Sequence, residues 1–213
     1  MAGFHSTSPL PPDTKTVVIA MLSSMSPYSH AVVDGQNIHP NLLRLMRHYA
    51  HGGHMPKRQQ FRPEELYWLY GYYYVVDVLG GGDYRFGYCG HCWQLFYGID
   101  LTGERLSEVE EHHPQLKLRR VEFDTVVADR HPSYSTGHMH WQDGNQASFH
   151  RLIIPFSGEN GAPSMLIVAA QSNITPTQLL HYKIHGNPKI DLQSQDWSAI
   201  TQQVSQPAER LNA

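Results

Sequence analysis

The sequence predicts an α+β fold in which one antiparallel sheet packs against helices. Two alternating aromatic segments around a glycine turn, at residues 72–88, are typical of a hairpin. Several short helical patterns follow, and three further alternating segments lie within residues 134–171. With 213 residues, 40% of them hydrophobic, the chain is long enough for one domain with a substantial core.

Two helices are expected before the first strand. The first begins at Pro40, whose fixed φ suits the first helical turn, and runs to His51, where Gly52-Gly53 ends it. The second begins at Pro63, is followed by two acidic residues that suit the positive end of a helix, and reaches Tyr70. The apolar residues of the first helix follow helical spacing: Leu42, Leu43, Leu45, Met46 and Tyr49.

The hairpin is predicted from residues that alternate along two strands. The turn between the strands consists of Gly80, Gly81 and Gly82. A strand follows this turn, whereas a phosphate-binding loop would precede a helix, so the three glycines do not indicate a nucleotide site. The alternating residues are Tyr72, Tyr74, Val76 and Val78 on the first strand, and Tyr84, Phe86 and Tyr88 on the second.

The remaining elements are short helices, one longer helix and three strands. The longer helix, at 115–129, carries an apolar stripe at Phe123, Val126 and Val127. Asp143-Gly144 is a strong signal for a turn between the first two of these strands. The predicted short helices span 93–97 and 106–111, and the strands span 134–141, 146–156 and 164–171.

Composition limits the classes of function. The 16 Lys and Arg residues against 19 Asp and Glu give a net charge of −3, which argues against direct nucleic-acid binding. No apolar run approaches the roughly 18 residues that span a membrane, so we expect no membrane association and a cytoplasmic protein. Two cysteines are too few for a disulfide framework. The 15 histidines are the main compositional oddity.

The hairpin and the loop after it carry a recognisable pattern. Its residues are Asp77, Arg85, Phe86, Gly90 and the segment Gly-Ile-Asp-Leu-Thr-Gly at 98–103. Together with the strand pair at 151–170, this pattern resembles a bacterial family of short, stand-alone PAS domains. The resemblance covers residues 38–172. We therefore expect residues 1–37 to form a flexible N-terminal extension and residues 173–213 to form a partly helical tail.

The resemblance implies a PAS-like five-stranded antiparallel sheet with helices on one face. It also implies a non-enzymatic sensory, signalling or protein-interaction domain, acting through a protein partner or as a homodimer formed through the helix at 40–51. It leaves the ligand and cofactor open. Haem of the usual PAS type is not expected, because that haem is ligated from the long helix and residues 115–129 contain no His, Cys or Met.

Cys89 and Cys92 form the tetrapeptide Cys-Gly-His-Cys where a strand meets a helix. A cysteine at a helix N-terminus gains thiolate character, which suits a redox pair. The α/β pattern that usually surrounds such a pair is absent, so small structural cysteines are the favoured interpretation. The alternatives are that the two cysteines form a redox pair or bind a metal. In either case the chain would be a redox or metal-binding protein.

His138, His140 and His150 are candidate metal ligands on adjacent strands. If the turn is centred on Gly144, His138 faces His150 and three imidazoles converge, which suits zinc or another transition metal. If Asp143-Gly144 forms a two-residue turn, His138 faces Phe149 and the cluster dissolves. The two-residue turn is favoured, and with it a solvated face rich in histidine.

The last candidate site is the space between the sheet and the helices. Large aromatic side chains there are typical of an ordinary core, and they also suit a pocket for a small apolar or aromatic ligand. The hydroxyl groups of buried tyrosines need partners, which a ligand or water could provide. The residues expected to border this pocket are Tyr74, Phe86, Tyr88, Trp93 and Phe123.

Overall fold

The computed structural model describes residues 38–50, 54–113, 116–141, 144, 146–173 and 189–194. The N-terminal extension expected at 1–37 lies outside the described residues, as does most of the expected tail at 173–213.

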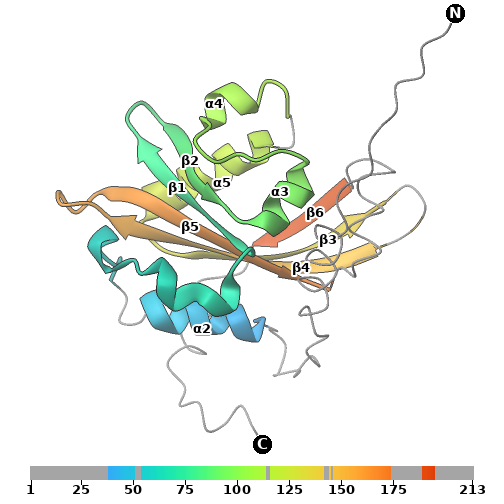
Figure 1. Ribbon diagram of the computed structural model, residues 1–213, viewed down its shortest axis with the longest axis horizontal. Coiled ribbons are helices and arrows are strands. Elements are labelled where there is room, and N and C mark those ends of the chain that lie inside the picture. The colour runs from blue at the N-terminus through green and yellow to red at the C-terminus, as the bar shows by residue number, and fades with distance from the viewer. Residues whose placement is uncertain are drawn as a thin grey trace, which may run out of the picture.

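The described residues form one six-stranded sheet with the strand order β2-β1-β5-β4-β3-β6, and every neighbouring pair is antiparallel (Figure 1). All five predicted strands are confirmed. A sixth, β6, comes from the predicted tail and pairs with the edge of β3. The strands are β1 (Tyr73–Leu79), β2 (Asp83–Cys89), β3 (Ser133–His140), β4 (Gln146–Ser157), β5 (Pro163–Ser172) and β6 (Lys189–Ser194).

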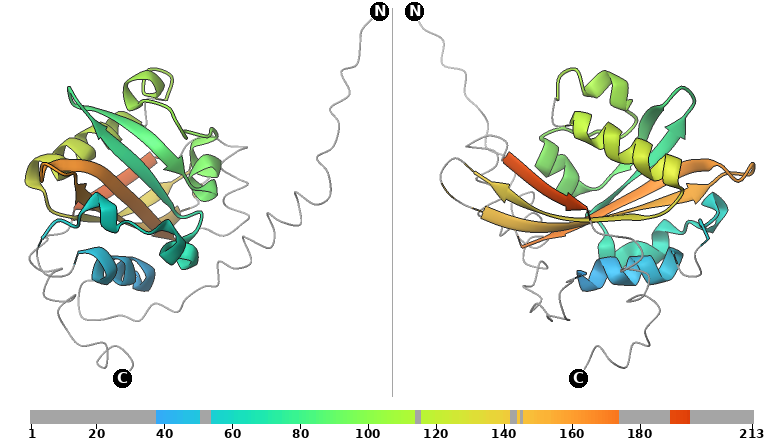
Figure 2. Two further views of the ribbon diagram at one scale, coloured as in Figure 1. Left: turned by 60° about the vertical axis from the view of Figure 1, so that its left-hand side comes forward. Right: turned by 180° about the vertical axis from the view of Figure 1, so that it is seen from behind.

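Helices cover both faces of the sheet (Figure 2). The expected group lies on one face, here called the α5 face, and consists of α3 (His91–Tyr97), α4 (Leu106–Val109) and α5 (Lys117–Asp129). The opposite face, here called the α2 face, is covered by α2 (Pro40–Tyr49) and by two 3₁₀ helices, η1 (Arg58–Gln60) and η2 (Pro63–Leu69). Each face has its own buried core.

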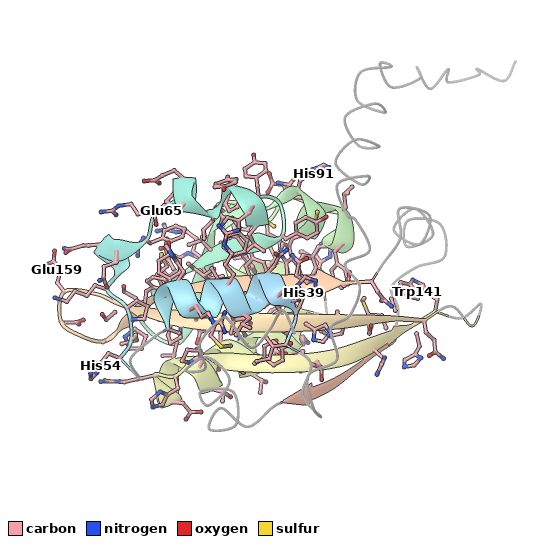
Figure 3. All side chains as sticks on the ribbon, turned by 90° about the horizontal axis from the view of Figure 1, so that it is seen from below. His39, His54, Glu65, His91, Trp141 and Glu159 are labelled. Carbon is pink, nitrogen blue, oxygen red and sulfur yellow. The ribbon has the colours of Figure 1, made fainter. Side chains whose placement is uncertain are left out.

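Helix α2 forms where the sequence predicts it and lies over one face of the sheet (Figure 3). Pro40 occupies the first turn, and the His39 ring accepts a hydrogen bond from the amide of Asn41 at 3.2 Å, which caps the N-terminus. One side of the helix is buried against the strands, through Leu42, Leu45, Met46 and Tyr49. At these four positions the apolar side of α2 is therefore already covered by its own chain.

A β-bulge at Gly87 changes which residues of β2 face each side of the sheet. The register pairs Val76 with Phe86 but Val75 with Tyr88, so Gly87 has no partner of its own. As a result, Phe86 lies on the α5 face and Tyr88 lies on the α2 face. Regular alternation would have placed them on the same face.

The segment at 98–103 anchors β2 to the rest of the domain. The Asp100 carboxylate accepts a hydrogen bond from the Thr102 amide at 2.9 Å, and the Thr102 hydroxyl accepts one from the Cys89 amide at 3.1 Å. The Gly103 amide donates to the Phe86 carbonyl at 2.6 Å, where the positive φ of Gly103 suits glycine. These contacts give this part of the PAS-like pattern a structural role.

Candidate functional site

The α5 face holds an aromatic cluster between β1, β2, α3 and α5. Tyr74, Phe86, Trp93 and Phe123 are all buried there. The ring centroids of Tyr74 and Trp93 lie 4.7 Å apart in an edge-to-face arrangement, and those of Tyr74 and Phe86 lie 5.6 Å apart. Four of the five residues predicted to border a pocket therefore lie together.

The fifth, Tyr88, does not join them. Its ring packs beside that of Tyr73 on the α2 face, with the centroids 5.1 Å apart. The prediction assumed uninterrupted alternation along β2, and the bulge at Gly87 moves Tyr88 to the other side of the sheet. The same bulge brings Cys89 onto the α5 face.

A buried polar cluster lies beside the aromatic rings. Arg119 and Glu122 come from α5, and Arg151 comes from β4. Glu122 pairs with both arginines, one through each carboxylate oxygen. The two arginines are only 3% and 2% exposed, which is rare for this residue type and requires partners.

Two tyrosines complete the buried polar cluster, Tyr74 from β1 and Tyr97 from α3. Burial raises the pKa of both phenols, and Arg119 and Glu122 are close enough to influence both pKa values. The Tyr74 hydroxyl has no hydrogen-bond partner among the described residues. The same is true of the Nε–H groups of Arg119 and Arg151. The cluster therefore contains buried donors that the described protein groups do not satisfy.

Helix α5 is held over the sheet by contacts at its outer edge. The Tyr84 hydroxyl donates to Asp124 at 2.6 Å. Arg120 pairs with Glu110 at 3.1 Å and lies 3.6 Å from Asp83 at the start of β2. These contacts connect α5 to β2 and to the segment after α4. A displacement of α5 would therefore also displace the β1–β2 hairpin.

Cys89 and Cys92 lie at the junction of β2 and α3 as predicted, and both thiols are free. Burial raises the pKa of each to about 11. A redox-active cysteine needs the opposite shift, because the thiolate is the reactive form. The electrostatics of this site therefore favour the structural interpretation over the redox pair.

We expect both cysteines to react slowly with iodoacetamide at pH 8. A rise in thiol pKa from 9.0 to about 11 lowers the thiolate fraction about a hundredfold at that pH. Labelling followed by intact mass should therefore be at least that much slower in the native chain than in urea, and should accelerate as pH rises towards 11. Rapid native labelling, or a two-hydrogen mass loss under mild oxidation, would support a redox pair instead.

The predicted registers of the β3–β4 hairpin are both wrong. His138 lies opposite Ser148, and His150 lies opposite Thr136. The reason is that five residues, 141–145, separate the two strands, instead of a two-residue turn or a loop centred on Gly144. Nδ1 of His150 lies 2.7 Å from the Tyr134 hydroxyl.

The three histidines consequently do not assemble into the metal site considered from the sequence. The rings of His138 and His140 lie 6.2 Å apart on β3, while His150 is engaged with Tyr134 beneath α2. Across the described ranges, no three His, Cys, Asp or Glu side chains lie close enough to hold a metal ion.

The buried polar cluster is what sequence reasoning missed. Arg119 lies four and seven residues before Phe123 and Val126, on the apolar stripe of α5. An arginine in such a stripe is a weak signal that a charge is buried. Arg151 gives a similar signal, because it precedes an apolar strand segment and is followed at alternate positions by Ile153 and Pro155.

Similarity to known proteins identifies the family of this chain. The PAS domain model matches residues 41–169. Solved structures of VqmA are similar: a complex with ligand and DNA from Vibrio cholera (13% identity, TM-score 0.38, 58% of this chain and 57% of that one) and VqmA bound to DPO (18% identity, TM-score 0.34, 56% and 61%). This chain thus spans less than two thirds of either solved chain.

No curated protein matches the sequence. Among the described residues, no helix is both long and apolar enough to cross a membrane. The match to the PAS model extends over more than half of the chain and runs from α2 into β5, so that only β6 of the sheet lies entirely outside it. The chain belongs to the PAS domain family.

Proposed function

We propose that this chain is a non-enzymatic sensory PAS domain that binds a small ligand on the α5 face and signals through a protein partner or a second copy of itself. The observation that carries the proposal is the buried Tyr74 hydroxyl, which has no partner among the described residues and lies within the aromatic cluster. A buried polar group without a partner costs free energy, and a ligand that bonds to it removes this cost.

The surroundings of Tyr74 suit a ligand that is partly aromatic. The Trp93 ring is in edge-to-face contact with the Tyr74 ring, and the centroid of Phe123 lies 6.5 Å from that of Tyr74. Aromatic walls with a few convergent polar groups are typical of small-molecule sites. Because Phe123 belongs to α5, a ligand that prefers one position of α5 would shift the population of that position.

Dimerisation through α2 remains a prediction. A charged substitution on the buried side of α2 would not test it. Met46 is fully buried against the sheet of its own chain, so a charge there would unfold the domain. Leu43 is only partly buried and is the better position for such a substitution. A monomeric wild type in sedimentation would leave the protein partner as the route of signalling.

A thermal-shift screen tests ligand binding. At ten times its Kd, a ligand that binds only the native state should raise the melting temperature by about 3–6 °C. Tyr74→Phe should reduce the shift, whereas Tyr88→Phe, a tyrosine on the opposite face, should leave it unchanged. If no compound of any charge class shifts the melting temperature, ligand sensing is wrong and the domain is a plain interaction module.

A further inference from the structure

The buried polar cluster carries more positive than negative charge. Arg119 and Arg151 contribute two guanidinium groups, and Glu122 is the one carboxylate that pairs with them among the described residues. With Glu122 ionised, one positive charge stays uncompensated. Burial raises the pKa of Glu122, although Arg119 opposes this, and protonation of Glu122 would leave both positive charges uncompensated. The cluster is therefore cationic in either state.

The hydrogen-bonding groups of the cluster that lack a partner among the described residues are mostly donors: two arginine Nε–H groups and the hydroxyls of Tyr74 and Tyr97, which can both donate and accept. The Nε–H groups of Arg119 and Arg151 can only donate, and neither has an acceptor among the described residues. The Tyr74 hydroxyl is able to donate as well, and burial raises its pKa, which keeps the proton on the oxygen. Among the described residues, the cluster lacks a second negatively charged acceptor beside Glu122.

The groups around these donors are apolar rings. Tyr74 and Trp93 are in edge-to-face contact, and the guanidinium of Arg151 lies 5.9 Å from the centroid of the Phe149 ring. A fully hydrated ion would gain little from such walls, whereas a ring or short apolar body would pack against them. One uncompensated charge matches a monoanion better than a phosphate dianion.

We propose that the buried polar cluster binds the carboxylate of a small aromatic acid, with Arg119, Arg151 and the Tyr74 hydroxyl as donors. This rests on the proposed function, which it deepens by naming the ligand class. The bound carboxylate neutralises the remaining guanidinium, and its two oxygens accept from donors that are otherwise unsatisfied. The aromatic part of the ligand packs against the aromatic side chains between α5 and the sheet.

Isothermal titration of the full chain tests this with matched probes: benzoate, phenylacetate and 4-hydroxybenzoate, their neutral amides, and phenyl phosphate. At least one acid should bind tenfold or more tightly than its amide. Tyr74→Phe should weaken the binding of that acid by about 10–100-fold, which corresponds to the loss of a hydrogen bond to a charged group. Because the hydroxyl has no partner among the described residues, Tyr74→Phe should leave the melting temperature of the free protein unchanged or raised.

Tyr88→Phe is the control and should leave the affinity for the acid unchanged, since Tyr88 lies on the α2 face. Equal affinity for an acid and its amide, with both weakened by Tyr74→Phe, would overturn the anionic ligand class and leave the proposed function standing. Tighter binding of phenyl phosphate, or an acid affinity that Tyr74→Phe does not change, would also overturn it. Failure of every acid to bind would do the same, while the proposed function fails only if the broader screen finds no ligand.

Discussion

Replacing Glu122 by glutamine is expected to lower the free energy of unfolding by about 3–5 kcal/mol. The substitution keeps the size of the side chain and removes the only charge that pairs with Arg119 and Arg151 among the described residues. Both guanidinium groups would then be buried without a counterion, at 3% and 2% exposure. Urea denaturation of the wild type and the variant measures the difference.

Glu65→Gln is the matched control for this experiment. Glu65 pairs with His48, but its side chain is 51% exposed, so the loss should stay within about 1 kcal/mol. A loss of less than about 1 kcal/mol for Glu122→Gln would mean that the two arginines are solvated, and would contradict a buried charged cluster. An aromatic acid that binds there should restore part of the stability that Glu122→Gln loses.

Gly90→Ala is the second substitution with a large expected effect, a loss of about 3 kcal/mol or more. A methyl group at Gly90 would lie 2.5 Å from the carbonyl oxygens of both Gly71 and Tyr73. These are backbone atoms of the turn before β1 and of its first residue, and they cannot move away as the end of a side chain can. Thermal and urea unfolding would measure the loss.

The backbone of Gly90 makes the cause of this loss specific. Its φ of −62° and ψ of 150° are open to alanine, so the expected loss comes from collision and not from backbone strain. Gly80→Ala is the control, because a methyl group there meets nothing within 4 Å. It should be neutral or slightly stabilising. A Gly90→Ala variant as stable as the Gly80→Ala variant would show that β1 and the start of α3 are not packed so closely.

Periodicity was sufficient to predict most of the architecture. The alternating residues around Gly80–Gly82 predict β1 and β2, and the stripe at Phe123 and Val126 predicts the buried side of α5. These patterns work because a strand or a helix must bury one side of itself. Strand β6 is harder to predict, since Lys189–Ser194 is short and alternates only two apolar residues, Ile190 and Leu192, with polar ones, and it pairs with the edge of β3.

Errors in the predicted sites came from single residues that interrupt a pattern. One extra residue at Gly87 moves Tyr88 to the α2 face, and a turn longer than expected changes the partner of His138. A one-residue change reverses the face of every residue that follows, so predictions of faces are more fragile than predictions of strands.

Buried charge was the hardest feature to predict. Arginine is mostly exposed in proteins, so the weak signals at Arg119 and Arg151 do not justify predicting burial until a partner is known. Their shared partner, Glu122, lies 29 residues before Arg151 and three after Arg119. Only the packing of α5 on β4 brings the three together.

Amide hydrogen exchange with and without the strongest compound from the screen tests most directly whether the ligand binds on the α5 face. Binding there should slow exchange in α3 and α5 and in the part of β4 around Arg151, because the ligand contacts side chains from all three. Exchange in α2, on the opposite face of the sheet, should stay unchanged. Protection confined to α2 and η2, or a compound that raises the melting temperature without slowing exchange in α5, would contradict a ligand site between α5 and the sheet.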